Sequence, residues 1–295
     1  MKLPLELVAT VAAAVDAGTL DAAARTLHIT PSAVSQRIRA LEERIGRTLL
    51  IRSKPLRATE AGETVVRLAR QLALLEHDTL RSLGLDEEGP ARLALAVNAD
   101  SLATWFLPAV ARIVAEGDVA IELHRDDQDY TARLLADGSV SAAVTSQSAA
   151  VAGCTVTPLG VMSYRACATP VFARRWFAGG VNAQSLARAP VIEYDRRDDL
   201  QARWLRARGA SVEPPPRIFV PASHDFATAV RSGLGWGMLP PLQADGPIAA
   251  GEIVVLEGDP VDVPLYWQQW DLRSPLLDRV AHVVVDEARR ALSPA

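Results

Sequence analysis

Two closely spaced helix signals near the N-terminus restrict the fold of this chain more than any other feature. Asp21 can cap a short helix over Ala22–Leu27, whose three consecutive alanines allow another helix to approach closely. Thr30 followed by Pro31 is an N-cap with proline at the first helical position, and it predicts a helix that reaches about Arg44. Two short helices joined by such a tight turn are typical of a helix-turn-helix.

The polar face of the second helix carries residue types that contact DNA. Its apolar stripe, which we expect to be buried, consists of Val34, Ile38, Leu41 and Ile45. Gln36 can read adenine through two hydrogen bonds, whereas serine and threonine hydroxyls more often bind phosphate or sugar. From this helix we predict DNA contacts by Thr30, Pro31, Ser32, Ser35, Gln36 and Arg39.

A basic segment follows the two helices. Residues 48–59 alternate apolar and basic side chains around Pro55, which predicts a wing whose Arg52, Lys54 and Arg57 contact the DNA backbone or minor groove. Residues 25–57 carry a net charge of +6 although the whole chain carries −4, so the remainder carries −10. This asymmetry favours a small nucleic-acid module joined to a larger acidic body. The alternative is a solvated charged face on a helical hairpin of an unrelated core.

A long helix is expected to follow the wing. Past Thr59, a plausible cap, a seam repeats at alternating three- and four-residue steps through Val65, Leu68, Leu72, Leu75, Thr79 and Leu83. Such a seam favours dimerisation, and a helix buried within its own domain is the alternative. Residues 83–90 contain turn-forming and acidic residues, so we place a linker there.

The rest of the chain alternates strand-like and helix-like segments. Strands are predicted near residues 92–97, 119–123, 141–145, 161–168, 191–194, 218–220, 236–239 and 253–256. This alternation predicts an α/β body, and the spacing fits two small sheets better than one. Open α/β sheets bind ligands beyond the carboxyl ends of their strands, so candidate ligand contacts are sought there.

Polar residues that follow the predicted strands form a candidate ligand site. Ser101 and Thr104 stand at a helix start, where free backbone N–H groups favour a carboxylate, and Thr145 adds a hydroxyl. Aspartates follow other strands, and Trp105 can stack on an alkyl chain or a guanidinium. Singly, each aspartate is more often a helix cap or a solvated loop residue. As a group they suit lysine or arginine, with contacts from Ser101, Thr104, Trp105, Asp127, Thr145, Asp198 and Asp225.

Several function classes are disfavoured. Cys154 and Cys167 lack a metal-binding spacing and the five histidines are scattered, so we expect no metal and no cofactor. Ser223, His224 and Asp225 are adjacent and cannot by themselves supply the geometry of a hydrolase triad, so we do not expect an enzyme. No segment approaches the ~18 consecutive apolar residues of a membrane span, and no signal peptide is evident. We expect a cytoplasmic protein without a membrane partner.

Longer motifs resemble a known family over essentially the whole chain. The run from Ala22 to Gly46, with Leu49-Leu-Ile-Arg52 and Ala58-Thr-Glu-Ala-Gly62, is similar to the N-terminal domain of LysR-type transcriptional regulators. The form Ser32-Ala-Val-Ser-Gln-Arg37, together with residues 98–106 and 264–268, resembles the arginine- and lysine-responsive branch of that family.

The resemblance implies both an architecture and a function. It implies a winged helix-turn-helix over residues 1–60, a linker helix and hinge over 61–90, and an effector domain over 91–295 like a periplasmic binding protein. Lobe I would comprise residues 91–162 and 266–295, and lobe II residues 163–265. The protein would be a sequence-specific regulator that binds double-stranded DNA, responds to a basic amino acid and controls an amino-acid exporter or a related gene.

The resemblance also implies a homodimer or homotetramer that activates by contact with RNA polymerase. The alternative is a solute-binding protein or an enzyme whose N-terminal module serves only oligomerisation and does not bind DNA. The basic stretch over residues 25–57 opposes this alternative.

Overall fold

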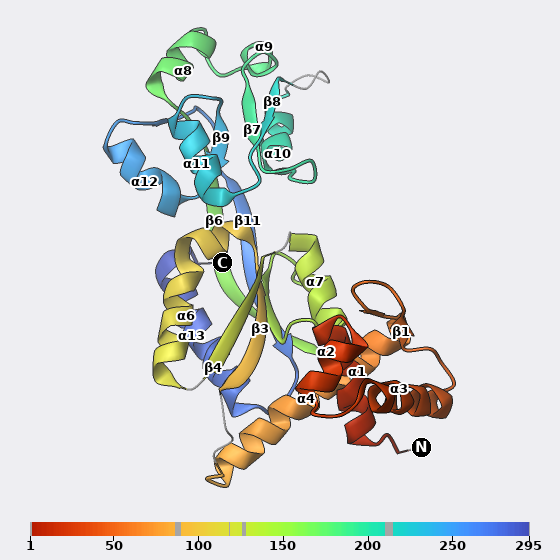
Figure 1. Ribbon diagram of the computed structural model, residues 1–295. Coiled ribbons are helices and arrows are strands. Elements are labelled where there is room, and N and C mark those ends of the chain that lie inside the picture. The colour runs from red at the N-terminus through yellow and green to blue at the C-terminus, as the bar shows by residue number, and fades with distance from the viewer. Residues whose placement is uncertain (1, 86–89, 118, 126–127, 210–214, 295) are drawn as a thin grey trace.

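The protein is described from a computed structural model, which covers residues 2–85, 90–117, 119–125, 128–209 and 215–294. A small N-terminal domain and a long helix lie beside a body of two lobes (Figure 1). Two long strands run from one lobe into the other through a narrow waist.

The N-terminal domain is a helix-turn-helix followed by a two-stranded wing. Its elements are α1 (Leu5–Ala17), α2 (Leu20–Thr26), α3 (Pro31–Ile45), β1 (Leu50–Ile51) and β2 (Arg57–Ala58). Thr30 caps α3 as predicted, because its Oγ1 accepts a hydrogen bond from the amide of Ala33 at 3.2 Å. The cap predicted for α2 is wrong: extended Thr19 accepts from the amide of Ala22, and Asp21 lies in the first turn.

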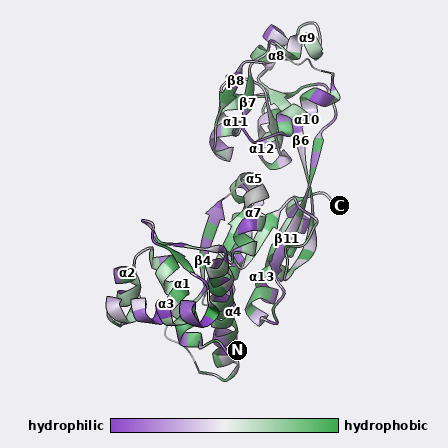
Figure 2. Ribbon diagram, turned by 90° about the vertical axis from the view of Figure 1, so that its right-hand side faces the viewer, coloured by the Kyte–Doolittle hydropathy of each residue, from purple (hydrophilic) through white to green (hydrophobic). Residues whose placement is uncertain are grey.

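The core of this domain explains the alanines of α2. Ala23 and Ala24 are buried against the apolar faces of α1 and α3, where larger side chains would hold the helices apart. Val34 and Leu41 of the predicted stripe are fully buried, and Ile38 is nearly so. The opposite side of α3 is left to polar residues, and its ribbon is largely hydrophilic (Figure 2).

The long helix α4 (Glu60–Ser82) connects the N-terminal domain to the body. Thr59 caps it by accepting from the amide of Gly62 at 3.1 Å, which confirms the predicted start. Its first turns complete the core of the N-terminal domain through Val65, Val66 and Ala69.

Two arginines of α4 hold it against the body. Arg67 donates to the carbonyl oxygens of Ala152 and Gly153 at 2.9 and 3.3 Å. Arg70 donates to the carbonyl oxygen of Gly138 at 2.6 Å and also pairs with Asp16 of α1. One guanidinium therefore contacts the N-terminal domain and the body at once.

The lower lobe in Figure 1 is built around a mixed sheet. Its strands are β3 (Ala91–Val97), β4 (Val119–Arg125), β5 (Ala142–Thr145) and the adjoining parts of β6 (Cys154–Ala168) and β11 (Val261–Trp270). β3 pairs in parallel with β4 and β5, and β5 pairs antiparallel with β11. Helices α6 (Leu107–Glu116) and α13 (Pro275–Ala291) cover one face, and α7 (Gln128–Ala136) covers the other.

The upper lobe is made of shorter elements. β9 (Gly237–Leu239) and β10 (Val254–Val255) pair antiparallel with β6, and β7 (Val191–Glu193) pairs in parallel with β8 (Arg217–Phe219). The lobe's helices are α8 (Pro170–Trp176), α9 (Ala183–Leu186), α10 (Leu200–Ala207), α11 (Ser223–Arg231) and α12 (Pro241–Ala249). A buried pair, Trp204 and Trp236, packs at 5.0 Å between ring centroids in its core.

The prediction of two separate small sheets is wrong in one respect. Hydrogen bonds run through seven strands from β10 and β9 of the upper lobe to β4 of the lower lobe, because β6 and β11 belong to both. β6 therefore begins at Cys154, seven residues before the predicted strand at 161–168. The expected lobe boundaries, 162/163 and 265/266, fall inside these two strands, and the register shifts between Leu265 and Tyr266.

No single helix of the described chain combines the length and the apolar composition that a membrane span requires. Helices α1 and α2 meet both requirements only when they are taken together, and the pair is bent by 120°. Both helices contribute apolar residues to the core of the N-terminal domain.

Gly62 offers a test of how α4 meets the wing. A Cβ there would lie 2.0 Å from the carbonyl oxygen of Leu49, so Gly62→Ala forces α4 away from β1. We expect the free energy of unfolding to fall by about 1 to 3 kcal/mol, as for overpacked cores, when measured by denaturant titration.

Gly246→Ala in α12 is the matched control, because a Cβ there meets nothing within 4 Å. Because Gly246 directly precedes Pro247, which disfavours a Cβ in the helical region, no gain from helix propensity is expected and the change should stay within about 0.5 kcal/mol. Equal effects of the two substitutions would contradict the close packing of α4 on the wing.

Candidate nucleic-acid interface and ligand cavity

The polar face of α3 is free in the N-terminal domain. Ser32, Ser35, Gln36 and Arg39 are all exposed, on the side of the helix opposite its buried stripe. Arg39 donates to Glu43 at 3.0 Å, but both side chains remain largely in solvent. Such an exposed pair is worth little and can exchange for a phosphate contact.

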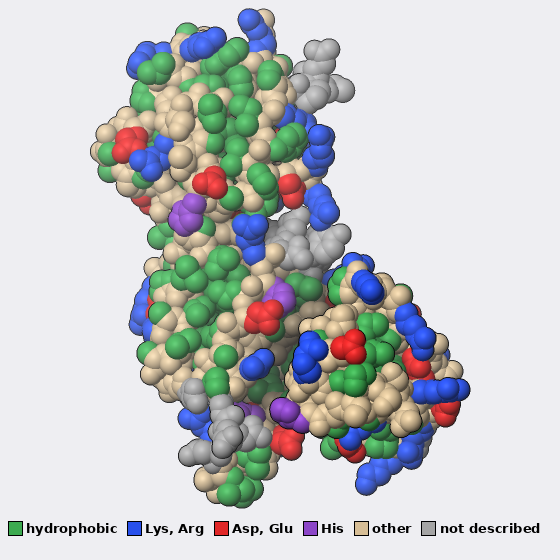
Figure 3. Space-filling view, in the orientation of Figure 1, with side chains coloured by type: hydrophobic (Ala, Val, Ile, Leu, Met, Phe, Trp, Pro, Cys, Tyr) green, Lys and Arg blue, Asp and Glu red, His purple; other side chains and the backbone are tan. Residues whose placement is uncertain are grey.

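The wing places its cations beside this helix face. Arg52, Lys54 and Arg57 are exposed, and β1 pairs with β2 so that Ile51 lies opposite Arg57. Figure 3 shows Lys and Arg side chains along the outer surface of the N-terminal domain. The capping Thr30 and the first helical residue, Pro31, are also exposed at the start of α3. All nine residues predicted to contact DNA therefore lie at the surface of one small domain.

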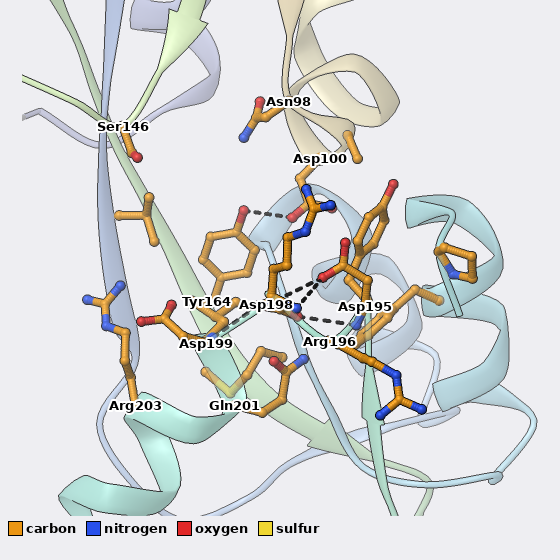
Figure 4. Close-up of a pocket in the computed structure, with 18 of the residues that line it drawn as sticks. Asn98, Asp100, Ser146, Tyr164, Asp195, Arg196, Asp198, Asp199, Gln201 and Arg203 are labelled. Carbon is orange, nitrogen blue, oxygen red and sulfur yellow. Dashed lines mark hydrogen bonds between the residues drawn. The ribbon is translucent and has the colours of Figure 1, made fainter. Parts of the chain in front are cut away.

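A cavity of about 910 Å³ lies between the two lobes. Its volume is within the usual range for small-molecule sites. Figure 4 shows side chains from both lobes around it. Its polar lining comprises Asn98, Asp100, Arg125, Ser146, Tyr164, Tyr194, Asp195, Arg196, Arg197, Asp198, Asp199, Gln201, Arg203 and Gln243.

The loop between β7 and α10 supplies the acidic wall. Asp195 accepts hydrogen bonds from the amides of Arg197 and Asp198, which folds the loop into a turn. Asp198 accepts from the amides of Leu200 and Tyr194 at 3.0 and 3.2 Å. Burial raises the pKa of Asp198, and the backbone hydrogen bonds only partly oppose that shift. A cation at this wall would favour its charged form.

Asp100 joins the two lobes across the cavity. Its carboxylate accepts from the hydroxyl of Tyr164 on β6 at 2.8 Å and from the hydroxyl of Ser223 on α11 at 2.6 Å. Gln243 of α12 donates to the same Ser223 oxygen at 2.9 Å. Burial, followed by the charge of Asp100, raises the pKa of Tyr164 well above its ordinary value, so the phenol stays a hydrogen-bond donor.

One predicted ligand residue lines the cavity, and several others do not. Asp198 faces the cavity. Ser101 is fully buried, and Trp105 is packed edge-to-face on Phe106 in the core of the lower lobe. The expected stacking of Trp105 on a ligand is therefore corrected, since burying a large indole in the core outweighs leaving it in a cleft.

The hydroxyls of two further predicted residues are hydrogen-bonded to backbone groups of the protein. Thr104 donates to the carbonyl oxygen of Asp100, and Thr145 accepts from the amide of Gln147. The chain after β3 continues through α5 (Ala99–Ser101) into a π-helical turn, η1 (Leu102–Phe106), and Asp100 rather than Thr104 reaches the cavity.

Of the two remaining predicted aspartates, the structure describes only one. Asp225 is exposed on α11 and is absent from the residues that line the cavity. Asp127 lies outside the described residues.

Sequence reasoning missed most of the lining. Arg125 ends β4, so the expectation that ligand contacts lie at the carboxyl ends of strands could have found it. Tyr164 lies within a strand, and Gln201 and Gln243 lie on helices, so no local signal marks them. Only the packing of the lobes brings them to one cavity.

Comparison with known proteins assigns both parts of the chain. Residues 5–63 match the model of the bacterial regulatory helix-turn-helix protein, lysR family, and residues 86–289 match the LysR substrate binding domain. The chain belongs to the LysR family of transcriptional regulators. It is accordingly a DNA-binding regulator with a winged helix-turn-helix and a two-lobed effector domain, as the resemblance implied.

Relatives of this LysR-family chain extend over nearly its full length. It is 44% identical over 277 residues to the HTH-type transcriptional regulator LysG of Mycobacterium tuberculosis, covering 94% of this chain and 90% of that protein. Its structure matches the crystal structure of ArgP from Mycobacterium tuberculosis with a TM-score of 0.92 and 42% identity over the whole of both chains.

A further solved structure is full-length LysG from Corynebacterium glutamicum with bound effector Arg. It matches with a TM-score of 0.82 and 38% identity, over 99% of this chain and all of that one. The relatives are transcriptional regulators rather than enzymes.

The hydrogen bonds around Asp100 predict the effect of Ser223→Ala. The substitution removes one donor to the carboxylate and leaves the Gln243 amide without its acceptor. We expect the free energy of unfolding to fall by roughly 1.5 to 3 kcal/mol, the range for hydrogen bonds to charged groups, when measured by denaturant titration.

Thr228→Ala on the same helix is the control. The Thr228 hydroxyl is exposed and bonds only to a carbonyl of its own helix, so a change within about 0.5 kcal/mol is expected. A loss for Ser223→Ala no larger than this would show that the contact between the lobes contributes nothing.

Proposed function

We propose that this regulator binds a basic amino acid, arginine or lysine, in the cavity between its lobes. The observation that carries this is the β7–α10 loop, which brings three aspartates to the cavity and in which the half-buried Asp198 carboxylate accepts two backbone amides. A buried carboxylate is costly unless a positive group reaches it. The bound arginine in the Corynebacterium glutamicum relative supports the same class of ligand.

The opposite charges of the cavity suit an amino acid that carries charge at both ends. Arg125 and Ser146 of the lower lobe can take the carboxylate, and the loop of Asp195 and Asp198 can take the cationic side chain. Such a ligand contacts both lobes at once. It therefore has a different affinity for each arrangement of the lobes, which is the condition for shifting the protein between states.

The DNA contacts we propose remain those of the α3 face and the wing. Thr30, Pro31, Ser32, Ser35, Gln36 and Arg39 would lie along the major groove, and Arg52, Lys54 and Arg57 would contact the backbone or minor groove. Their exposure and common location support this assignment. Gln36 would carry sequence discrimination, and the cations would carry affinity.

We further propose a dimer through α4, and a tetramer on DNA by analogy with the family. Leu68, Leu72 and Leu75 of the predicted seam are only partly covered in a single chain, and Leu83 is 66% exposed. A second copy of α4 would bury them. Acting in the cytoplasm without an enzymatic activity, such an assembly would regulate an amino-acid exporter or a related gene through RNA polymerase.

The ligand assignment predicts a selective calorimetric titration without DNA. Arginine or lysine should bind saturably and leucine should not, because the leucine side chain carries no cation to the acidic wall. Asp198→Ala should weaken binding by roughly tenfold to a hundredfold, the range for a hydrogen bond to a charged group. Binding should also weaken as the pH falls, because protonation removes the charge of Asp198, whose raised pKa brings this loss to a higher pH.

Asp225→Ala provides the matched control, because Asp225 is exposed on α11 outside the cavity. It should leave the affinity unchanged. Absence of binding by arginine, lysine and histidine would rule out this ligand class and leave the DNA-binding assignment intact.

The DNA face predicts different effects for two substitutions, measured by fluorescence anisotropy on operator and random duplexes over a range of salt concentrations. Arg52→Ala should weaken both complexes alike and reduce the salt dependence by about one ion. Gln36→Ala should cost roughly 1 to 3 kcal/mol on the operator alone. An equal loss on both duplexes would remove Gln36 from base recognition.

A further inference from the structure

One polar atom of the cavity wall has no partner. Gln201 stands in the first turn of α10, is 1% exposed and is one of the residues that line the cavity. Its Oε1 is buried without a hydrogen bond among the described residues. Figure 4 shows its amide among the side chains around the cavity. Buried polar atoms are nearly always satisfied in folded proteins, so this acceptor calls for an explanation.

Two of the four arginines that line the cavity have contacts away from Gln201. Arg203, one residue beyond Ala202 on the same helix, donates to the carbonyl oxygen of Asp262 at 3.4 Å. The Arg196 guanidinium lies over the ring of Phe219 at 5.0 Å from its centroid. The acidic neighbour Asp198, three residues before Gln201, offers no donor when ionised. Asp198 and Gln201 both line the cavity from the segment where the loop enters α10, so the two acceptors lie on the same side of it, and both attract N–H groups.

We propose that Gln201 is a specificity-determining residue that accepts a hydrogen bond from the cationic side chain of the bound amino acid. This inference rests on the proposed function. The terminal torsion of a glutamine is soft, so rotation of the amide can turn Oε1 toward the cavity that the side chain already lines. A neutral acceptor beside a carboxylate suits a guanidinium or an ammonium, each of which can donate to both. A ligand without that donor leaves both acceptors unpaired and is rejected.

Gln201→Leu tests the proposal with two readouts that move in opposite directions. Affinity for arginine and lysine, measured by calorimetry on the full-length protein, should fall roughly tenfold to a hundredfold. The melting temperature of the ligand-free protein should not fall, and we expect a rise of about 2 to 4 °C, because an unpaired acceptor is replaced by an apolar group of similar size. A purely structural glutamine would instead lower the melting temperature when replaced.

Two further variants sharpen the result. Gln184→Leu makes the same substitution at an exposed site on α9, away from the cavity, and should change neither readout. Gln201→Glu keeps the acceptor and adds a charge, so arginine should bind at least as tightly as to the wild type. Norleucine, which lacks the side-chain cation, should not distinguish the wild type from Gln201→Leu.

The outcomes separate this inference from the function beneath it. If the wild type binds neither arginine nor lysine, the proposed ligand class fails and the role of Gln201 fails with it. If the wild type binds and Gln201→Leu binds equally well, only the role of Gln201 is overturned. Weaker binding with a lower melting temperature, or weaker arginine binding by Gln201→Glu, also overturns it.

Discussion

The antiparallel pairing of β6 with β11 connects the two lobes of the body. It runs from Tyr164 opposite Val261 to Cys154 opposite Trp270, so both strands belong to both lobes. The cavity lies between the two lobes that these strands connect, and the Asp100 carboxylate accepts hydrogen bonds from the hydroxyls of Tyr164 and Ser223 at its wall. The register shift after Leu265 is where such a ribbon bends most easily, because an irregular pair breaks the ladder locally.

The cavity and the DNA-binding domain are joined by short stretches of chain. One runs from Arg125, at the cavity, through α7 to Gly138, whose carbonyl oxygen accepts from Arg70. Another runs from Ser146, also at the cavity, to Ala152 and Gly153, which accept from Arg67. Arg70 also pairs with Asp16 of α1. A ligand changes DNA binding only if contacts of this kind differ between the two arrangements that it distinguishes.

Local signals in the sequence are most reliable where function lies on one element. Thr30 and Pro31 predict the start of α3, and the periodicity of Val34, Ile38 and Leu41 predicts which face turns outward. The polar side chains on that face then follow without knowledge of the rest of the molecule. Even here one detail was wrong: Thr19 caps α2 in place of Asp21, although both residue types are favoured at N-caps.

Local sequence signals were sufficient to predict the helix-turn-helix, the wing, the long helix and the α/β character of the body, because each is encoded by caps, periods and charges within a short stretch. Tertiary structure decided which residues meet between the lobes. Ser101 and Trp105 follow a predicted strand, but their side chains are buried in the core. Asp100, Tyr164 and Gln201 instead line the cavity, and they come from elements far apart in the chain. The direction of a side chain at the end of a strand depends on the packing of the next turn, and no local pattern specifies that packing.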